Sequence, residues 1–192
     1  MKPVRILFVC TGNTCRSPMA EALLRAEAAG TGIELEVRSA GVAASAGMSV
    51  SRHAREALRR AGIQHEGSSS PVSGELVRWA DLILAMTGSH RRTLLQAFPQ
   101  AADKLHTLLE YAAGDRLAEL DRLYGERELE RSLGRPPEPE LERRIAELER
   151  TVRGGDIADP FGGPLEEYEA CAAEIRQAVR AVLRRLSEER LD

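Results

Sequence analysis

The sequence has 192 residues, which suits one compact domain with an appendage. With 43% hydrophobic and 30% charged residues, its composition is that of a globular protein and excludes wholesale disorder. A net charge of −3 and an aromatic content of 4% give neither the overall basic field nor the stacking surface typical of nucleic-acid binding. No apolar run approaches the roughly 20 residues that cross a membrane, and the first apolar stretch is too short for a secretory signal, so we expect a cytoplasmic protein.

The first half of the chain alternates short apolar runs with helical patterns. Residues 6–9 (ILFV) form an apolar run without polar alternation, which is typical of a buried parallel strand. A turn-rich loop over residues 10–18 follows, and Pro18 is placed at the start of the next helix. Residues 35–38 are the centre of a second strand that closes by Gly41, and residues 51–61 have a helical pattern.

The second half repeats this alternation. Residues 81–86 (DLILAM) predict a third buried strand, a helix follows over residues 91–98, and residues 105–109 predict a fourth strand. The last helix, over residues 165–186, places its apolar side chains on one stripe. Strands that alternate with helices at this spacing predict an α/β fold with a doubly wound sheet of four parallel strands.

Residues 116–153 do not fit the alternation. About half of them are charged, in both signs, and Gly134 is followed by two prolines that break the segment. Leu141, Ile145 and Leu148 are at helical spacing. We predict a helical insertion of two pieces, which either covers part of the sheet as a solvated hairpin or acts as a lid or docking element for a partner.

The loop after the first strand carries the chemistry. Backbone N–H groups of a strand-to-helix loop converge on one concavity, and the helix N-terminus adds positive potential, so an anion binds there. This potential favours the thiolate of Cys10, which is a nucleophile at neutral pH. Arg16 is placed to grip two phosphoryl oxygens, and Gly12 is expected to adopt a backbone conformation closed to other residues.

Three further polar side chains complete the predicted loop. Ser17 is expected to donate a hydrogen bond to the sulfur, and Asn13 to tie the loop to its surroundings, for instance to Ser39. A nucleotide-binding P-loop is excluded because its lysine is missing, and a dinucleotide fingerprint because its glycines are absent. The alternative interpretation is that the pattern has no function, with Cys10 buried in the core and Arg16 on the surface, apart from each other.

A thiol-dependent phosphate transfer needs a proton donor for the leaving group. Asp159 is the best candidate, since it stands on a rigid turn (DPFGG) shortly before the last helix. That position lets a loop carry the carboxyl group over the phosphate.

Four motifs in this order carry a family resemblance: VCTGNTCRSPMAEAL, VRSAG, ADLILAMTGSH and DPFGG. Together they resemble the low-molecular-weight protein tyrosine phosphatase family over nearly the whole chain. The resemblance implies a single phosphatase domain over residues 1–192 with a flavodoxin-like sheet, no metal and no cofactor, and a cysteinyl-phosphate intermediate. It implies Cys10 as the nucleophile, Arg16 as the phosphate clamp and Asp159 as the general acid. The residues around the phosphate would be Thr11, Gly12, Asn13, Thr14, Cys15 and Ser17, with Ser39 as a support.

Position 14 indicates the substrate. Tyrosine-directed members of the family usually carry a bulkier aliphatic residue there, and Thr14 resembles the bacterial protein-arginine phosphatase branch, as does MTGSH at residues 86–90. We therefore expect hydrolysis of phosphoarginine on proteins. The alternatives are a protein tyrosine phosphatase, an arsenate reductase and a non-catalytic phosphate-binding module whose insertion at 116–153 recruits a partner.

The remaining cysteines and His90 receive smaller roles. The resemblance implies that Cys15 forms a reversible disulfide with Cys10 under oxidation, the alternative being a packed Cys15. Cys171 is expected in the core, where it is badly placed for arsenate reduction. His90 is expected to buttress the loop.

Overall fold

The structure, a computed structural model, describes residues 2–152 and 155–189. It has one four-stranded sheet in this part of the chain, with the order β2-β1-β3-β4 and all pairs parallel. The strands are β1 (Val4–Cys10), β2 (Leu35–Gly41), β3 (Leu82–Ala85) and β4 (Leu105–Thr107). The helices are α1 (Arg16–Ala28), α2 (Arg52–Arg60), α3 (Gly74–Trp79), α4 (Gly88–Ala97), the 3-10 helix η1 (Pro99–Lys104), α5 (Leu108–Ala113), α6 (Asp115–Ser132), α7 (Pro139–Val152) and α8 (Leu165–Glu189). The predicted α/β class is confirmed.

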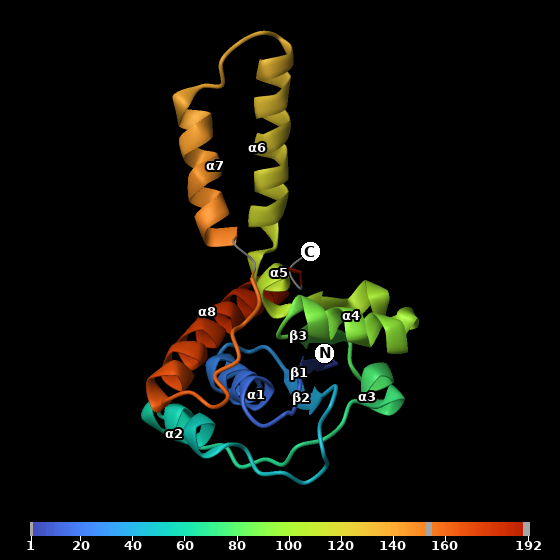
Figure 1. Cartoon of the computed structure of the whole chain (residues 1–192). Helices are drawn as coiled ribbons and strands as arrows, with labels where there is room; N and C mark the ends of the chain where they lie inside the picture. Colours follow the sequence, from blue (N-terminus) through green and yellow to red (C-terminus); the bar gives the residue numbers. More distant parts are fainter. Residues whose placement is uncertain (1, 153–154, 190–192) are drawn as a thin grey trace.

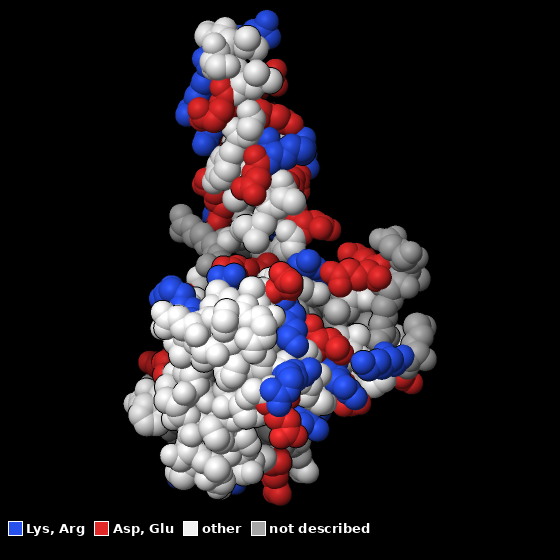
Figure 2. Space-filling view, turned by 90° about the vertical axis from the view of Figure 1, so that its right-hand side faces the viewer, with Lys and Arg blue, Asp and Glu red and all other residues white. Residues whose placement is uncertain are grey.

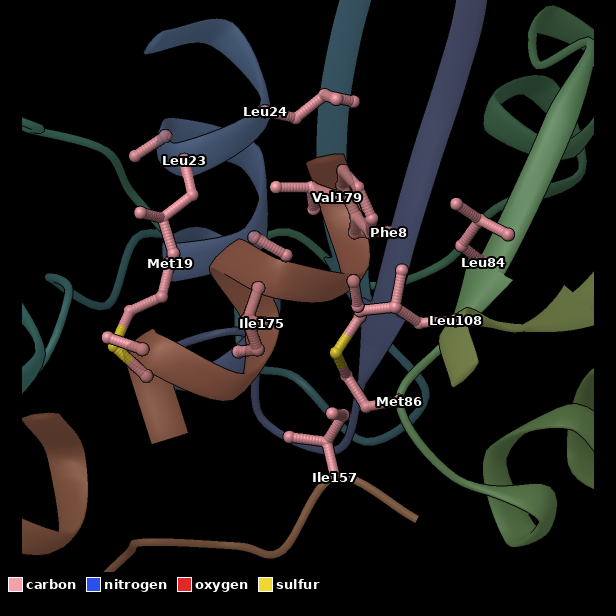
Figure 3. Packing of buried hydrophobic residues seen from close by; sticks show 14 of the residues in the cluster. Phe8, Met19, Leu23, Leu24, Leu84, Met86, Leu108, Ile157, Ile175 and Val179 are labelled. Atoms are coloured by element: carbon pink, nitrogen blue, oxygen red, sulfur yellow. The ribbon is translucent and has the colours of Figure 1, made fainter. Parts of the chain in front are cut away.

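Helices cover both faces of the sheet because successive side chains of β1 point to opposite sides. Ile6 and Phe8 are buried in the cluster formed with α1, α2, α5 and α8. Leu7 and Val9 are buried in a second cluster, with side chains of α3 and α4. Figure 1 shows the helices in these two layers, and Figure 3 shows Phe8 facing Val179 of α8. A strand buried on both faces needs an apolar side chain at every position, which explains the run ILFV.

The last helix holds the first of these layers in place. The predicted stripe of α8 is buried as expected and includes Ala172, Ile175, Val179, Val182 and Leu186. Cys171 is also buried on this helix, as predicted. Within the described residues, no helix combines the length and the apolar character needed to cross a membrane.

Several predicted boundaries differ from the observed ones: α4 begins at Gly88 and not at residue 91, and two further differences have a clear local cause. Helix α1 begins at Arg16, so Pro18 is its third residue, a position whose N–H also lacks an intrahelical partner. The fourth strand ends at Thr107 rather than at residue 109. Thr107 and Glu110 form a capping box in which each side chain accepts a hydrogen bond from the other's backbone N–H, and this starts α5.

The charged segment forms a hairpin of two helices, α6 and α7, as predicted. Its own small apolar cluster joins the helices and includes Leu120, Leu123 and Ile145. The hairpin projects away from the sheet, so the first of the two alternatives, a hairpin that covers part of the sheet, is wrong (Figure 1). Acidic and basic side chains are interspersed along it (Figure 2). A partner for this segment stays a prediction; the large apolar side chains of Leu129 and Leu133 are exposed on it.

The topology locates the site. The crossover from β1 through α1 leads to β2 on one side of β1, whereas β3 pairs on its other side. In open α/β sheets, ligands bind beyond the carboxyl ends of the strands at such a switch point. The loops that follow β1 and β3 therefore meet where a ligand site is expected.

Candidate active site

The loop between β1 and α1 is short and tied down. Cys10 ends the strand, Arg16 begins the helix, and both are buried, with 3% and 5% of their surface exposed. Backbone carbonyls of the loop accept hydrogen bonds from outside it: Val42 N–H donates to the Cys10 carbonyl and Ser51 N–H to the Thr14 carbonyl, both at 2.9 Å. The loop is thus held from the segment that follows β2.

Two donors face the sulfur of Cys10. Ser17 Oγ lies 2.9 Å from Cys10 Sγ, and the backbone N–H of Asn13 donates to the same sulfur at 3.3 Å. A thiolate accepts both hydrogen bonds, whereas a neutral thiol makes them weakly. The site therefore provides two hydrogen-bond donors for the sulfur.

Asn13, not Gly12, has the unusual backbone. Its φ is 55°, in the left-handed region where asparagine is enriched, while Gly12 has no positive φ, so the expectation for Gly12 is wrong. The Asn13 side chain donates to Ser17 Oγ at 2.8 Å and to Ser39 Oγ at 2.9 Å. The side-chain oxygen of Asn13, Oδ1, accepts a hydrogen bond from the backbone N–H of Ser70 at 2.9 Å. These contacts hold the strained residue from three segments of the chain.

Gly41 allows the loop to approach β2 closely. A Cβ atom at Gly41 would lie 2.4 Å from the Thr11 carbonyl oxygen and 3.0 Å from the Asn13 nitrogen. We expect Gly41→Ala to lower the free energy of unfolding by about 1–3 kcal/mol, because backbone atoms cannot move aside as a flexible side chain does. Gly125→Ala is the control: this exposed position on α6 has free space, and the same change should stabilise the helix by about 0.5–1 kcal/mol. Urea denaturation measures both; equal effects would contradict the proposed close approach.

Arg16 and Asp159 face each other across the site. Arg16 Nη1 donates to the Ile157 carbonyl at 2.9 Å, and Nη2 lies 3.4 Å from Asp159 Oδ2. The Arg16 side chain is 6% exposed and that of Asp159 51%, so the carboxyl group stands at the mouth of the site. A guanidinium has five N–H groups, and these contacts leave donors for phosphoryl oxygens.

The segment that carries Asp159 is fixed to the end of β3. The backbone N–H of Ile157 donates to the Met86 carbonyl at 2.9 Å, and the Asp156 carboxylate accepts the N–H of Gly88 at 2.8 Å. Asp159 also accepts the backbone N–H of Phe161 at 3.2 Å, which shapes the turn. Asp159 is therefore flanked by a segment that is fixed to the end of β3 and by a turn that its own carboxyl group stabilises.

These groups enclose one cavity of about 230 Å³. It is lined by Cys10, Thr11, Gly12, Thr14, Cys15, Arg16, Asp159 and Phe161. The predicted residues that do not line it are Asn13, Ser17 and Ser39, which hold the loop from behind. Phe161 is 77% exposed at the rim, and residue spacing alone did not single it out for a role.

The other two cysteines have different surroundings. Cys15 Sγ donates to Ser51 Oγ at 3.4 Å and lies 3.6 Å from the hydroxyl of Tyr168. Burial, and then a hydrogen bond to Cys15, raise the pKa of Tyr168 to about 12. Burial likewise raises the pKa of Cys171 to about 12, so its thiol is a poor nucleophile at neutral pH. All three cysteines are free thiols.

The sequence comparison decides the family. The model for the family described as Low molecular weight phosphotyrosine protein phosphatase matches residues 5–154, about four-fifths of the chain. The chain belongs to the low-molecular-weight phosphotyrosine protein phosphatase family. The match includes the loop from Cys10 to Ser17 and ends before Asp159.

Relatives within this family carry two activity names. A protein-arginine-phosphatase of Geobacillus stearothermophilus is 37% identical over 187 residues, which cover 97% of this chain and 99% of the relative. The solved structure of a YwlE arginine phosphatase Cys-to-Ser mutant with a phosphorylated active-site serine has a TM-score of 0.75 at 35% identity, with 97% and 98% of the two chains covered. The structure of a low-molecular-weight protein tyrosine phosphatase from T. tengcongensis has a TM-score of 0.72 at 33% identity, with 95% and 99% covered.

Two residues of this phosphatase site had no local signal in the sequence. Ser70 and Tyr168 reach the loop only through the fold. Ser51 was expected near the start of a helix, and it caps α2 through the backbone N–H of Ala54. His90 was expected beside the loop, and its Nε2 lies 2.7 Å from Thr11 Oγ1.

Proposed function

We propose that this protein is a protein phosphatase that hydrolyses phosphoarginine on proteins through a phosphate ester of Cys10. The observation that carries the proposal is the cavity in which a sulfur, a buried guanidinium and a carboxyl group converge. Nucleophile, phosphate clamp and proton donor are the three parts that such a reaction requires.

The first step transfers the phosphoryl group to sulfur. The Cys10 thiolate attacks phosphorus in line with the departing nitrogen, so that an S–P bond forms while the P–N bond breaks. The nitrogen takes the proton of the Asp159 carboxyl group and leaves as part of a guanidinium. Arg16 and the backbone N–H groups of the loop hold the phosphoryl oxygens throughout.

The second step releases phosphate. Water attacks the phosphorus, and the Asp159 carboxylate, now deprotonated, takes its proton. The S–P bond breaks, and the electron pair returns to Cys10, where Ser17 Oγ and the Asn13 N–H stabilise the thiolate. Because both donors are already in place, no reorganisation is needed when the charge appears.

The rim of the cavity suits a guanidinium leaving group. Once it has given up its proton, the Asp159 carboxylate can pair with the departing guanidinium, and the exposed ring of Phe161 offers a flat face on which a guanidinium stacks. Thr14 lines the same cavity. The relative named protein-arginine-phosphatase, which matches nearly end to end, supports this substrate.

Phosphotyrosine is the second candidate, supported by the structure from T. tengcongensis that carries that name. The two substrates share the phosphoryl group and differ in the leaving group and its charge. The direct test is turnover of matched phosphoarginine and phosphotyrosine peptides by the same preparation. A preference for phosphotyrosine would remove the arginine assignment and leave the cysteine chemistry standing.

Thr14→Ile should shift this preference. We expect the ratio of kcat/KM for phosphoarginine over phosphotyrosine to fall about tenfold, because isoleucine replaces the hydroxyl of a residue that lines the cavity and offers an apolar surface to an aromatic ring. Thr14→Ser, which keeps the hydroxyl, is the matched control and should retain the wild-type preference for phosphoarginine over phosphotyrosine. A ratio that Thr14→Ile leaves unchanged would contradict a role for this residue in substrate choice.

The proposal also includes location in the cytoplasm. It is supported by the three free thiols, because a catalytic thiolate persists in a reducing compartment. The expected substrates are phosphorylated proteins.

A further inference from the structure

His90 is a buried titratable group that the proposed reaction leaves without a task. It belongs to the first turn of α4, which follows β3, and 6% of its surface is exposed. Its Nε2 atom lies 2.7 Å from Thr11 Oγ1 in the loop after β1. Its Nδ1 atom is buried and has no hydrogen-bond partner within the described part of the chain.

The missing partner of Nδ1 indicates which nitrogen carries the proton. A neutral imidazole has one N–H and one lone pair. Buried N–H groups without an acceptor are rare, whereas an under-used acceptor is tolerated more often. The lone pair therefore belongs on Nδ1 and the proton on Nε2, so that His90 donates its hydrogen bond to the Thr11 oxygen.

The burial of the ring favours its neutral form. Burial, and then the positive charge of Arg16, lower the pKa of His90, while Asp156 and Asp159 oppose the shift. A doubly protonated ring would also leave a buried N–H at Nδ1 without an acceptor. Near neutral pH the ring is thus a single donor of fixed direction.

This donor determines what the Thr11 hydroxyl can do. With its oxygen accepting from Nε2, the hydroxyl has its own proton left to donate. Thr11 lines the cavity that Cys10, Arg16 and Asp159 share, and no other partner of its side chain is found in residues 2–152 and 155–189. The free proton is therefore available to an oxygen of a bound phosphoryl group.

We propose that His90 is a positioning residue that fixes the Thr11 hydroxyl as a hydrogen-bond donor to the phosphoryl oxygens. The inference rests on the proposed function and deepens it, since it gives the side-chain hydroxyl of Thr11 a hydrogen bond to the transferred phosphate. The contact between His90 and Thr11 also connects two loops of the site. One is the segment after β3, which forms hydrogen bonds to Asp156 and Ile157, and the other contains the nucleophile.

The tautomer is tested on the wild-type protein by nitrogen-15 NMR of the histidine rings at neutral pH. The resonances of His90 are assigned by their loss in His90→Gln. We expect a neutral ring with the proton on Nε2. A proton on Nδ1, or a doubly protonated ring, would overturn the inference whatever the enzyme's activity.

The coupling is tested by binding of inorganic phosphate, a readout that needs no turnover. Thr11→Val should weaken binding about tenfold, the size expected for a hydrogen bond to a charged group. His90→Leu should weaken it in the wild-type background and have no further effect in the Thr11→Val background. Independent losses that multiply in the double variant would show that His90 acts by another route and would overturn the coupling.

Conservative variants separate positioning from packing. The amide nitrogen of glutamine reaches the place of Nε2, so His90→Gln should keep phosphate affinity within about twofold of wild type, and Thr11→Ser should do the same. A loss in His90→Gln as large as in His90→Leu would refute the donor role. The proposed function is judged separately, by whether Cys10→Ser stops hydrolysis, so that one idea can fail without the other.

Discussion

Cys10→Ser is expected to lower kcat by about 10⁴-fold or more, the scale seen when a hydrolase loses its nucleophile. The serine hydroxyl is almost never ionised at neutral pH, and it is a poor leaving group in the second step. Serine is nearly the same size, and Ser17 and the Asn13 N–H remain as its partners. The folded site should therefore still bind inorganic phosphate, and calorimetry or fluorescence titration measures this beside phosphate release from a phosphopeptide.

The matched control is Cys171→Ser, on α8. That thiol is buried and burial raises its pKa to about 12, so we expect its replacement to leave turnover nearly unchanged. An alkylating reagent should modify Cys10 before Cys171 in the wild type, and inorganic phosphate should protect Cys10. Hydrolysis that persists in Cys10→Ser would refute the assignment of the nucleophile.

The fold was predictable where the local sequence and the final environment agree. The strand over Leu82–Ala85 is buried at every position, so its sequence is one apolar run. The loop from Cys10 to Arg16 was predictable for a similar reason, because its residue types and spacing suit an anion-binding turn. The end of β4 was predicted wrongly although the sequence contains a signal for it. Thr107 and Glu110 have the spacing of a capping box, and this helix start takes the two leucines at 108–109 into α5 instead of the strand.

Other features depend on partners distant in the sequence. The apolar stripe of α7 could have packed on the sheet or on α6, and only the complementary side chains of α6, such as Leu120 and Leu123, decide between them. The positive φ of Asn13 is maintained by contacts to Ser39 and Ser70, which no local pattern contains. For that reason the sequence predicts an unusual backbone conformation in this loop but places it at Gly12 instead of Asn13.

Asp159→Asn should produce a loss that depends on the leaving group. An amide cannot give a proton to the departing nitrogen of phosphoarginine, so we expect kcat/KM for that substrate to fall about 10²–10³-fold. The p-nitrophenolate ion leaves without a proton, and its kcat/KM should fall less than about tenfold. This parameter reports the steps through formation of the phosphate ester on Cys10, which is where the two substrates differ.

In Asp159→Asn the hydrolysis of the phosphate ester on Cys10 also loses its general base, whichever substrate formed the ester. This second defect can be measured independently of the first. With p-nitrophenyl phosphate, Asp159→Asn should release a burst of p-nitrophenolate equal to the enzyme concentration and then turn over slowly, because the phosphate ester accumulates. Asp156→Asn is the matched control: its carboxylate accepts the N–H of Gly88 and faces no reacting atom, so its replacement should affect both substrates alike. Equal losses in kcat/KM for the two substrates in Asp159→Asn would mean that its carboxyl group positions Arg16, 3.4 Å away, rather than donating a proton.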